Sequence, residues 1–509
     1  MDKVSIRMYC VGTGDCLIVK FSNKKEKFLM MIDCGSCVGG PKEFLPYVEN
    51  LAELVKKEGG LDLLIITHEH QDHVNGFQKC RAIFEDPDFK IAEAWFAWTE
   101  HPSDPNDRVA DLQAKRKKMR MGFAKSLKSL KDNTDKIINS FEGDYSQPKV
   151  QKCHDAFLNG LLTLAEINLE ENFGITGESL PGMKAIKEIL KKKKTKIQYV
   201  NPGEIRTLES AKGLKFYILG PPYSQDSIFK EGKQGKDVYK KYLAMNQSDM
   251  AADLFNAIPD DSTDETDEKR LPFESRYLAN NDAVKQINEL TTVSKRFTRD
   301  DEGNLSKVDY ATSVTSMVAQ YRNSQNAWRK IDYDWLGTAG ALALRLNSHI
   351  NNTSLAMAVE FEKTGAVVLL PGDAEFGSWE SWHLIKKWKK KGKNERPLIE
   401  DLLGRTIFYK VAHHLSYNGT ALEKGIKMMP ENGIAAMVTL DRKRISSKWK
   451  STMPNTELLK ELIKRSDGKV FIMDEHGIKN PPSKFLDPKT LKKSEYEETP
   501  LYKQFTIKA

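Results

Sequence analysis

The segment Thr67-His68-Glu69-His70-Gln71-Asp72-His73 places three imidazoles and a carboxylate directly after the apolar run Leu61–Thr67. The chain has only ten histidines, so a large share of them is gathered at the end of one predicted strand. Imidazole nitrogens and carboxylate oxygens are ligands for zinc, manganese and iron. A loop at the end of a strand can turn these side chains inward, and the alternative is a chance surface cluster. The segment therefore predicts a metal site.

The spacing divides the four side chains into two pairs. His68 and His70 alternate along the chain and can bind one metal ion, while Asp72 and His73 turn toward a second ion. We expect two divalent ions, with zinc as the first choice and manganese or iron as alternatives. Two ions about 3.5–4 Å apart lower the pKa of a bridging water, which gives a hydroxide nucleophile near neutral pH. Asp72 is expected to orient that hydroxide.

The surrounding sequence alternates between strand and helix patterns. A helix is predicted over Glu43–Lys57, where Gly59-Gly60 ends it, and another over residues 74–85. A third helical region is expected around Trp379–Lys391. The predicted strands are Val4–Val11, Cys16–Phe21, Lys27–Asp33, Leu61–Thr67, Ile91–Thr99, Ile197–Asn201, Leu214–Leu219, Ser354–Phe361, Ala366–Leu370 and Thr406–Ala412. This alternation is typical of an α/β fold.

Two segments interrupt the alternation, so we expect one catalytic α/β domain that is split by two insertions. Residues 101–196 are helical, basic and polar, and residues 223–345 are irregular. The second insertion contains the acidic run Asp260–Glu268, which is predicted to be a mobile loop. The domain would then consist of residues 1–100, 197–222 and 346–509, with a C-terminal extension in the last part.

The formal net charge of +8 is concentrated in lysine-rich runs at Lys115–Lys118, Lys191–Lys194 and Lys386–Lys393. Such runs are either solvated helix faces or surfaces that face phosphate groups. Tryptophans near the last run have the spacing of a packed helix face, which we favour over stacking on bases. These tryptophans are Trp379, Trp382 and Trp388.

Neither a membrane span nor a disulfide framework is expected. No apolar run approaches the ~20 residues that cross a bilayer, and the N-terminus lacks a signal-peptide pattern, which predicts a cytoplasmic location and no membrane partner. Six cysteines are sparse for 509 residues. Cys34 and Cys37 form a CxxC without a second such pair, which favours small strand-end residues over a redox or zinc pair.

His-x-His-x-Asp-His after a hydrophobic strand resembles the signature of the metallo-β-lactamase superfamily. Val11–Asp15 and Ile32–Gly35 resemble the opening strands of that fold, and Leu219–Pro222 resembles a strand end in the middle of the domain. Leu369–Ala374 resembles the strand that delivers a metal-bridging aspartate, and Lys410–Ser416 resembles the His-His-Gly-Ser motif.

Together these motifs most resemble the hydrolase domain of bacterial DNA-uptake competence proteins and its stand-alone relatives. Asp467–Gly477 resembles the terminal hairpin of that branch. The resemblance covers about residues 1–100, 197–222 and 350–480. It implies an αββα sandwich with two helical or irregular insertions, in which His68 and His70 hold metal one and Asp72 and His73 hold metal two.

The resemblance also implies roles for residues in the second half of the chain. Asp373 would bridge both metals, and His414 would be the last ligand. His413 would then act as a proton donor or substrate contact, and the reverse assignment of the two histidines is the alternative. Ser416 and Asn418 are expected to contact the substrate.

The sequence departs from better-known members of the superfamily in two places. Zinc β-lactamases and tRNA 3′-processing nucleases supply a further histidine to metal one, for which only His101, His154 and His349 are available here. Whether any of them is a ligand stays open, because water or an amide can complete the shell. Leu415 replaces the glycine of His-His-Gly-Ser and is expected to narrow the room beside the metals.

Such a site fits phosphodiester, thioester and lactam substrates, so the fold alone does not choose among them. The lysine runs and the nucleic-acid-linked relatives favour a phosphodiesterase or nuclease, with nucleic acid or a nucleotide as substrate. Lys115–Lys118 and Lys191–Lys194 would then hold a nucleic-acid backbone beside the metals. The alternatives are hydrolysis of a small phosphodiester, such as a cyclic nucleotide or lipid head group, and a non-catalytic nucleotide sensor. The intact ligand set argues against a sensor.

Overall fold

The computed structural model describes residues 1–103, 108–132, 147–169, 180–239, 295–299, 305–309, 335–388, 397–445, 453–474, 485 and 490–509. The chain divides into two compact units. The first comprises Met1–Arg120, Leu162–Met245 and Leu344–Ala509, and the second comprises Met121–Leu161 and Asn246–Ala343. The predicted mobile loop Asp260–Glu268 lies outside the described residues.

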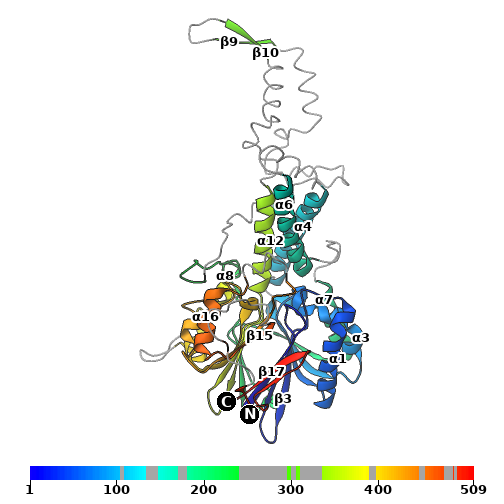
Figure 1. Cartoon of the computed structure of the whole chain (residues 1–509), viewed down its shortest axis with the longest axis vertical. Helices are drawn as coiled ribbons and strands as arrows, with labels where there is room; N and C mark the ends of the chain where they lie inside the picture. The colour runs from blue at the N-terminus through cyan, green and yellow to red at the C-terminus, as the bar shows by residue number, and fades with distance from the viewer. Residues whose placement is uncertain are drawn as a thin grey trace. The chain divides into compact units, whose positions relative to one another are not determined.

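The described part of the second unit consists of helical segments and one hairpin. The helices α4 (Arg108–Asp132), α6 (Gln147–Asn168) and α12 (Trp335–Asn351) each contribute a segment to it. The hairpin pairs β9 (Lys295–Arg299) with β10 (Leu305–Asp309) in antiparallel orientation (Figure 1).

The first unit contains a sheet with the strand order β16-β17-β1-β2-β3-β4-β5-β6. The strands from β3 to β6 are parallel, and the others pair in antiparallel orientation. β4 is apolar along most of its length because it lies in the parallel, central part of the sheet. The bounds are β1 Lys3–Tyr9, β2 Leu17–Ser22, β3 Lys27–Ile32, β4 Leu61–Ile66, β5 Ile91–Ala97, β6 Lys196–Val200, β16 Tyr496–Glu498 and β17 Tyr502–Lys508.

A second sheet has the order β15-β14-β13-β12-β11-β8-β7, in which β12 to β15 are parallel. Its bounds are β7 Ile205–Arg206, β8 Leu214–Ile218, β11 Met357–Phe361, β12 Val367–Leu370, β13 Thr406–Lys410, β14 Ala435–Asp441 and β15 Val470–Asp474. Aromatic side chains join the inner faces of the two sheets. The rings of Phe21 and Phe361 lie 5.5 Å apart, and those of Phe28 and Phe216 lie 5.7 Å apart.

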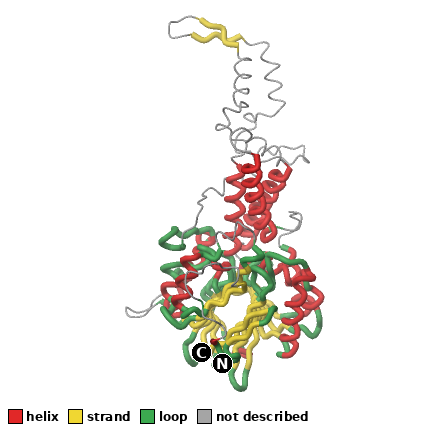
Figure 2. Tube along the Cα trace, viewed as in Figure 1, coloured by secondary structure: helices red, strands yellow, loops and turns green. Residues whose placement is uncertain are grey.

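Helices cover the outer face of each sheet, as the red layers on both sides of the yellow strands show (Figure 2). The helices beside the first sheet are α1 (Pro41–Lys57), α2 (Gln71–Lys79), α3 (Arg81–Glu85) and α7 (Pro181–Lys193). Those of the second half are α8 (Gln225–Ile228), α13 (Phe376–Trp382), α14 (Leu398–Gly404) and α16 (Thr456–Arg465). Short 3₁₀ turns occupy Trp98–Glu100, Glu209–Ala211, Lys386–Trp388, Ala412–Leu415 and Ile426–Met428. The predicted αββα sandwich is confirmed.

Three local predictions can be compared with this fold. The tryptophans of Trp379–Trp388 are buried, so their packing interpretation is confirmed and stacking on bases is wrong. Asp467-Gly468 leads from α16 into β15, which pairs in parallel with β14. The turn and return strand of the predicted terminal hairpin lie outside the described residues. The C-terminal strand β17 pairs with β1, which the sequence did not indicate. None of the helices that the structure describes combines the length and apolar character of a membrane span.

Candidate metal centre

The histidine-rich segment follows β4 and continues into the first turn of α2. Thr67 donates from its backbone nitrogen and its hydroxyl to the buried carboxylate of Asp33, which follows β3. Gly35 lets the chain after β3 pass against this turn, because a Cβ there would lie 2.4 Å from the carbonyl carbon of Asp72. Asp72 and His73 therefore project from a helix start that two loops hold in place.

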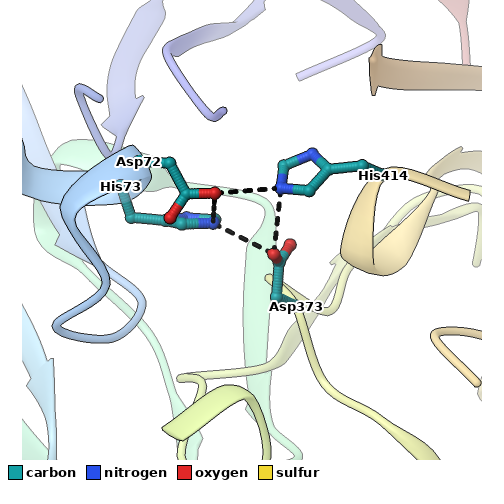
Figure 3. A group of neighbouring side chains, drawn as sticks. All are labelled: Asp72, His73, Asp373 and His414. Atoms are coloured by element: carbon teal, nitrogen blue, oxygen red, sulfur yellow. Dashed lines mark hydrogen bonds and ion pairs between the residues drawn. The ribbon is translucent and has the colours of Figure 1, made fainter. Parts of the chain in front are cut away.

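Four buried side chains converge beside this turn: Asp72, His73, Asp373 and His414 (Figure 3). Their candidate ligand atoms all lie within 4.8 Å of one another. Asp373 Oδ2 lies 3.1 Å from His73 Nε2 and 3.2 Å from His414 Nε2. Asp72 Oδ2 lies 3.3 Å from His414 Nε2. The predicted ligands of metal two are thus brought together from α2, the loop after β12 and the turn after β13.

Hydrogen bonds orient both imidazoles of this group. His73 places Nδ1 2.8 Å from Asp33 Oδ2, and His414 places Nδ1 2.9 Å from the carbonyl oxygen of Thr439. A carbonyl oxygen only accepts, so the proton of a neutral His414 stays on Nδ1 and its Nε2 faces the carboxylates. Asp72 Oδ1 is buried without a hydrogen-bond partner, and His414 Nε2 faces the carboxylate oxygens of Asp373 and Asp72. Such atoms fit ligands of a divalent cation.

The charges of this group also fit a cation. Burial lowers the pKa of His73, but the carboxylates of Asp373, Asp15 and Asp72 raise it more, so the net pKa lies well above its usual value. Burial likewise lowers the pKa of His414, and Asp373 and Asp72 together raise it to about 9. Both imidazoles therefore carry protons near neutral pH before a cation binds. A divalent cation can replace these protons, because metal ligation requires neutral imidazole.

Lys410 is a buried cation behind Asp373. Its Nζ lies 2.6 Å from Asp15 Oδ2 and 3.1 Å from Asp373 Oδ1. Burial lowers the pKa of Lys410, but the two carboxylates raise it by a larger amount. The net pKa lies above its usual value, so the ammonium stays charged. The ammonium occupies Oδ1 of Asp373 and leaves Oδ2 for the imidazoles.

His68 and His70 form a second pair that is not part of the four-residue group. His68 Nε2 lies 2.9 Å from His70 Nδ1, and His70 Nε2 lies 3.0 Å from Asn168 Oδ1. Burial, with the nearby imidazoles, holds the pKa of His68 well below its usual value, and burial lowers that of His70 to about 4. Both rings are therefore neutral at pH 7, as metal ligands must be.

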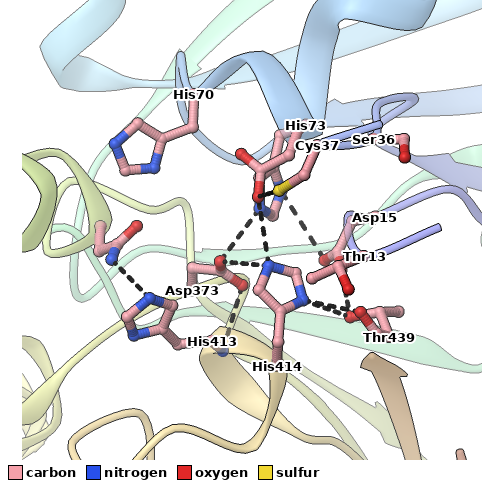
Figure 4. Close-up of polar contacts among 12 residues, drawn as sticks. Thr13, Asp15, Ser36, Cys37, His70, His73, Asp373, His413, His414 and Thr439 are labelled. Atoms are coloured by element: carbon pink, nitrogen blue, oxygen red, sulfur yellow. Dashed lines mark hydrogen bonds and ion pairs between the residues drawn. The ribbon is translucent and has the colours of Figure 1, made fainter. Parts of the chain in front are cut away.

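His413 lies beside the group but its ring is bound elsewhere (Figure 4). Its Nε2 lies 3.2 Å from the Asn351 amide nitrogen, and its Nδ1 lies 2.8 Å from Ser416 Oγ. Ser416 also donates to Asn418 Oδ1. This geometry favours His414 over His413 as the ligand. The proposed contacts of His413, Ser416 and Asn418 with a substrate stay predictions.

The turn that carries the two histidines is strained. His413, His414 and Leu415 have φ angles of 47°, 49° and 66°, which cost about 1–2 kcal/mol for each residue with a Cβ. The preference of the resembled motif for glycine at Leu415 has this physical reason. The Leu415 side chain is buried in the apolar core of the second sheet, so the expectation that it narrows the room beside the metals is wrong.

A cavity of about 90 Å³ opens onto these residues. His70, Asp72, Asp373, His413 and His414 all line it. Cys37, Glu166, Asn347, Asn351 and Arg444 contribute to the rest of its wall. The two predicted half-sites therefore face one common space.

A comparison with protein families agrees with this geometry. Residues 11–144 match the family model of the metallo-beta-lactamase superfamily. This segment belongs to a metallo-β-lactamase domain. No curated protein matches the chain. The match includes His68–His73 but ends before Asp373 and His414, which the structure brings to the same place. The narrower resemblance to competence proteins stays a prediction.

Cys37 is a residue of the metallo-β-lactamase domain whose position the sequence did not reveal. Its Sγ lies 3.5 Å from Asp72 Oδ2, and burial together with Asp72 raises the pKa of the thiol. Cys34 is buried, as expected, with its Sγ 3.9 Å from that of Cys16. The CxxC spacing could not predict this contact, because Asp72 lies outside the motif.

Two of the three histidines that were available as a further ligand have aromatic partners in the described structure. His349 is buried and stacks on Phe229 with ring centres 4.5 Å apart. His101 packs its ring against Tyr199. The side chain of His154 lies outside the described residues.

The two lysine runs of the first insertion lie at different ends of the first sheet. In Lys115–Lys118, Arg116 is buried and binds Glu69, which lies between the two metal-one histidines. In Lys191–Lys194, Lys192 pairs with Glu85, and the run ends just before β6, which begins opposite the start of β5. The metal centre follows the other end of these parallel strands. The expectation that Lys191–Lys194 lies beside the metals is therefore wrong.

Proposed function

We propose that the chain is a metal-dependent phosphodiesterase with two divalent cations, zinc being the first choice. The observation that carries this proposal is the buried convergence of Asp72, His73, Asp373 and His414 beside the His68–His70 pair. Bound cations there would supply the Lewis acidity that activates water and offsets charge on phosphoryl oxygens. A metallo-β-lactamase domain with metal-fitting His and Asp clusters supports the coarser description, a metal-dependent hydrolase.

The cavity wall gives the reason for choosing a phosphodiester. Arg444 offers a cation and Asn347 offers an amide, which bind phosphoryl oxygens by charge and hydrogen bonds. His413 shares this wall and is our proposed proton donor to a leaving group, a role that requires the release of one of its two ring partners, Asn351 or Ser416.

The small cavity favours a second candidate, which is hydrolysis of a small phosphodiester. A space of about 90 Å³ is far too small for a duplex and suits a small group such as a phosphoryl group. The position of Lys191–Lys194, away from the centre, also removes one of the surfaces expected to hold a nucleic-acid backbone.

Turnover of bis(p-nitrophenyl) phosphate by the zinc- or manganese-loaded chain tests the proposal. We expect metal-dependent release of p-nitrophenol that a chelator abolishes. Activity is then compared on plasmid DNA, single strands and cyclic dinucleotides to separate a nuclease from a small-diester hydrolase. Metal binding without turnover of any of these would contradict the enzyme and favour a sensor.

A further inference from the structure

Asn168, the last residue of α6, is a fully buried amide that contacts His70. Its Nδ2 donates to the carbonyl oxygen of Leu164 at 2.9 Å and to Asn347 Oδ1 at 3.1 Å. These two acceptors fix the orientation of the amide, so Oδ1 faces His70 Nε2. Because an amide oxygen only accepts, the neutral His70 carries its proton on Nε2 and has a free lone pair on Nδ1.

His68 shows the complementary arrangement. The Thr67 hydroxyl donates its proton to Asp33, so Thr67 Oγ1 can accept from His68 Nδ1 at 3.0 Å. In this tautomer the lone pair of His68 lies on Nε2, 2.9 Å from Nδ1 of His70, and a cation shared between the two lone pairs would remove their repulsion. In the other tautomer Ser354 Oγ, 3.2 Å away, donates to His68 Nδ1, and Nε2 donates to His70.

The residue between the two histidines is held by the same part of the chain. Glu69 Oε1 lies 2.6 Å from Arg116 Nη1 and 2.8 Å from Arg120 Nη2. Burial would raise the pKa of Glu69, but the two guanidinium groups lower it to about 2. Arg120 also donates from Nε to the carbonyl oxygen of Asn168 at 3.1 Å. Arg120 therefore joins the metal loop and Asn168 in one buried cluster.

We infer that Asn168 is a positioning residue, which fixes the tautomer and ring orientation of His70 for metal one. The inference rests on the proposed two-metal site. Asn168, Arg116 and Arg120 all belong to the first predicted insertion, so that insertion supports the metal-one pair. The two described candidates for a further histidine ligand pack against other rings: His101 contacts Tyr199 and His349 contacts Phe229.

Two substitutions at this position test the inference. Asn168→Leu removes the acceptor at similar volume. Asn168→Asp keeps it as a buried neutral acid, whose hydroxyl takes the place of Nδ2 beside Leu164 and Asn347. Zinc or cobalt binding is measured by competition with a chelator, together with the number of ions per chain. Loss of a group that orients a metal-ligating histidine costs about 10–100-fold in affinity. We expect that loss for one of two ions in Asn168→Leu and near wild-type binding in Asn168→Asp.

The second ion is the internal control for folding, because Asn168 is not one of the four residues that would hold it. These are Asp72, His73, Asp373 and His414. Asn201→Leu, which makes the same chemical change at a position bonded to Glu204 and Tyr223, should bind both ions normally. Unchanged binding of both ions by Asn168→Leu would overturn the inference. If Asn168→Leu fails to fold, Asn168→Asp decides: weak binding of one ion would also overturn it.

The same measurements keep this inference apart from the proposed function. A wild-type chain that binds two ions but hydrolyses no diester contradicts the function and leaves the positioning role standing. A wild-type chain that takes up no ion contradicts both.

Discussion

Replacing Lys410 by methionine should lower the free energy of unfolding, and the loss should be smaller when zinc is bound. The ammonium lies 2.6 Å from Asp15 and 3.1 Å from Asp373, and all three side chains are buried. Lys410→Met leaves both carboxylates without this partner, and breaking a buried ion pair in this way costs about 3–5 kcal/mol. A cation bound at Oδ2 of Asp373 would replace part of the missing charge. Zinc should therefore stabilise the variant more than the wild type, by roughly the 1–3 kcal/mol of an unsatisfied buried group.

The assay is urea unfolding of both proteins with chelator and with saturating zinc. Lys503→Met is the matched control, because Lys503 is also buried but lies 3.6 Å from the half-exposed carboxylate of Glu498, on the C-terminal strand. Lys503→Met should lose less free energy of unfolding than Lys410→Met, and the loss should be the same with and without zinc. A Lys410→Met variant whose loss of unfolding free energy is the same in both conditions would refute the electrostatic link between Lys410 and the metal centre.

Three further changes have expected outcomes. Asp72→Ala combined with His73→Ala should abolish hydrolysis while circular dichroism stays close to wild type, and more than a trace of activity would contradict the two-metal mechanism. His414 has a pKa of about 9 in the folded chain, above its ordinary 6.5, so its protonation stabilises the metal-free fold. This stabilisation is complete below pH 6.5 and disappears as the pH rises through 9. Urea unfolding should show a fall on the order of 3 kcal/mol over this window in chelator, and a flat profile would contradict the raised pKa. Charge reversal at Lys191–Lys194 should leave chromogenic diester turnover and the salt dependence of DNA binding unchanged, and a flattened salt slope would show that this run does contact phosphate.

The sequence predicted the first half of the metal centre because its ligands are neighbours in the chain. An apolar strand followed by His68–His73 already implies a polar turn at the end of a buried parallel strand, and β4 with the start of α2 has that form. The α/β class followed from the alternation of strands and helices, and the αββα sandwich followed from the resemblance to the metallo-β-lactamase superfamily. The start of α2 at Gln71 was missed because Asp72 and His73 suggest a loop, whereas their backbone forms a helical turn.

The choice between His413 and His414 needed the structure. Both are imidazoles in one strained turn, and only the partners of their ring nitrogens separate them. Thr439 binds Nδ1 of His414, whereas Ser416 and Asn351 occupy both nitrogens of His413. These partners lie on separate elements, so local sequence carries no information about them.

Strand direction explains why the first insertion has two different ends. β5 and β6 are parallel, so the chain that leaves β5 emerges at the edge of the sheet where β4 delivers His68. The chain must return to the opposite edge before it enters β6, which is where Lys191–Lys194 lies. Arg116 belongs to the outgoing part and reaches Glu69. Two lysine-rich runs with similar composition therefore cannot share one role, and residues that follow β5 directly are those that can support the metal centre.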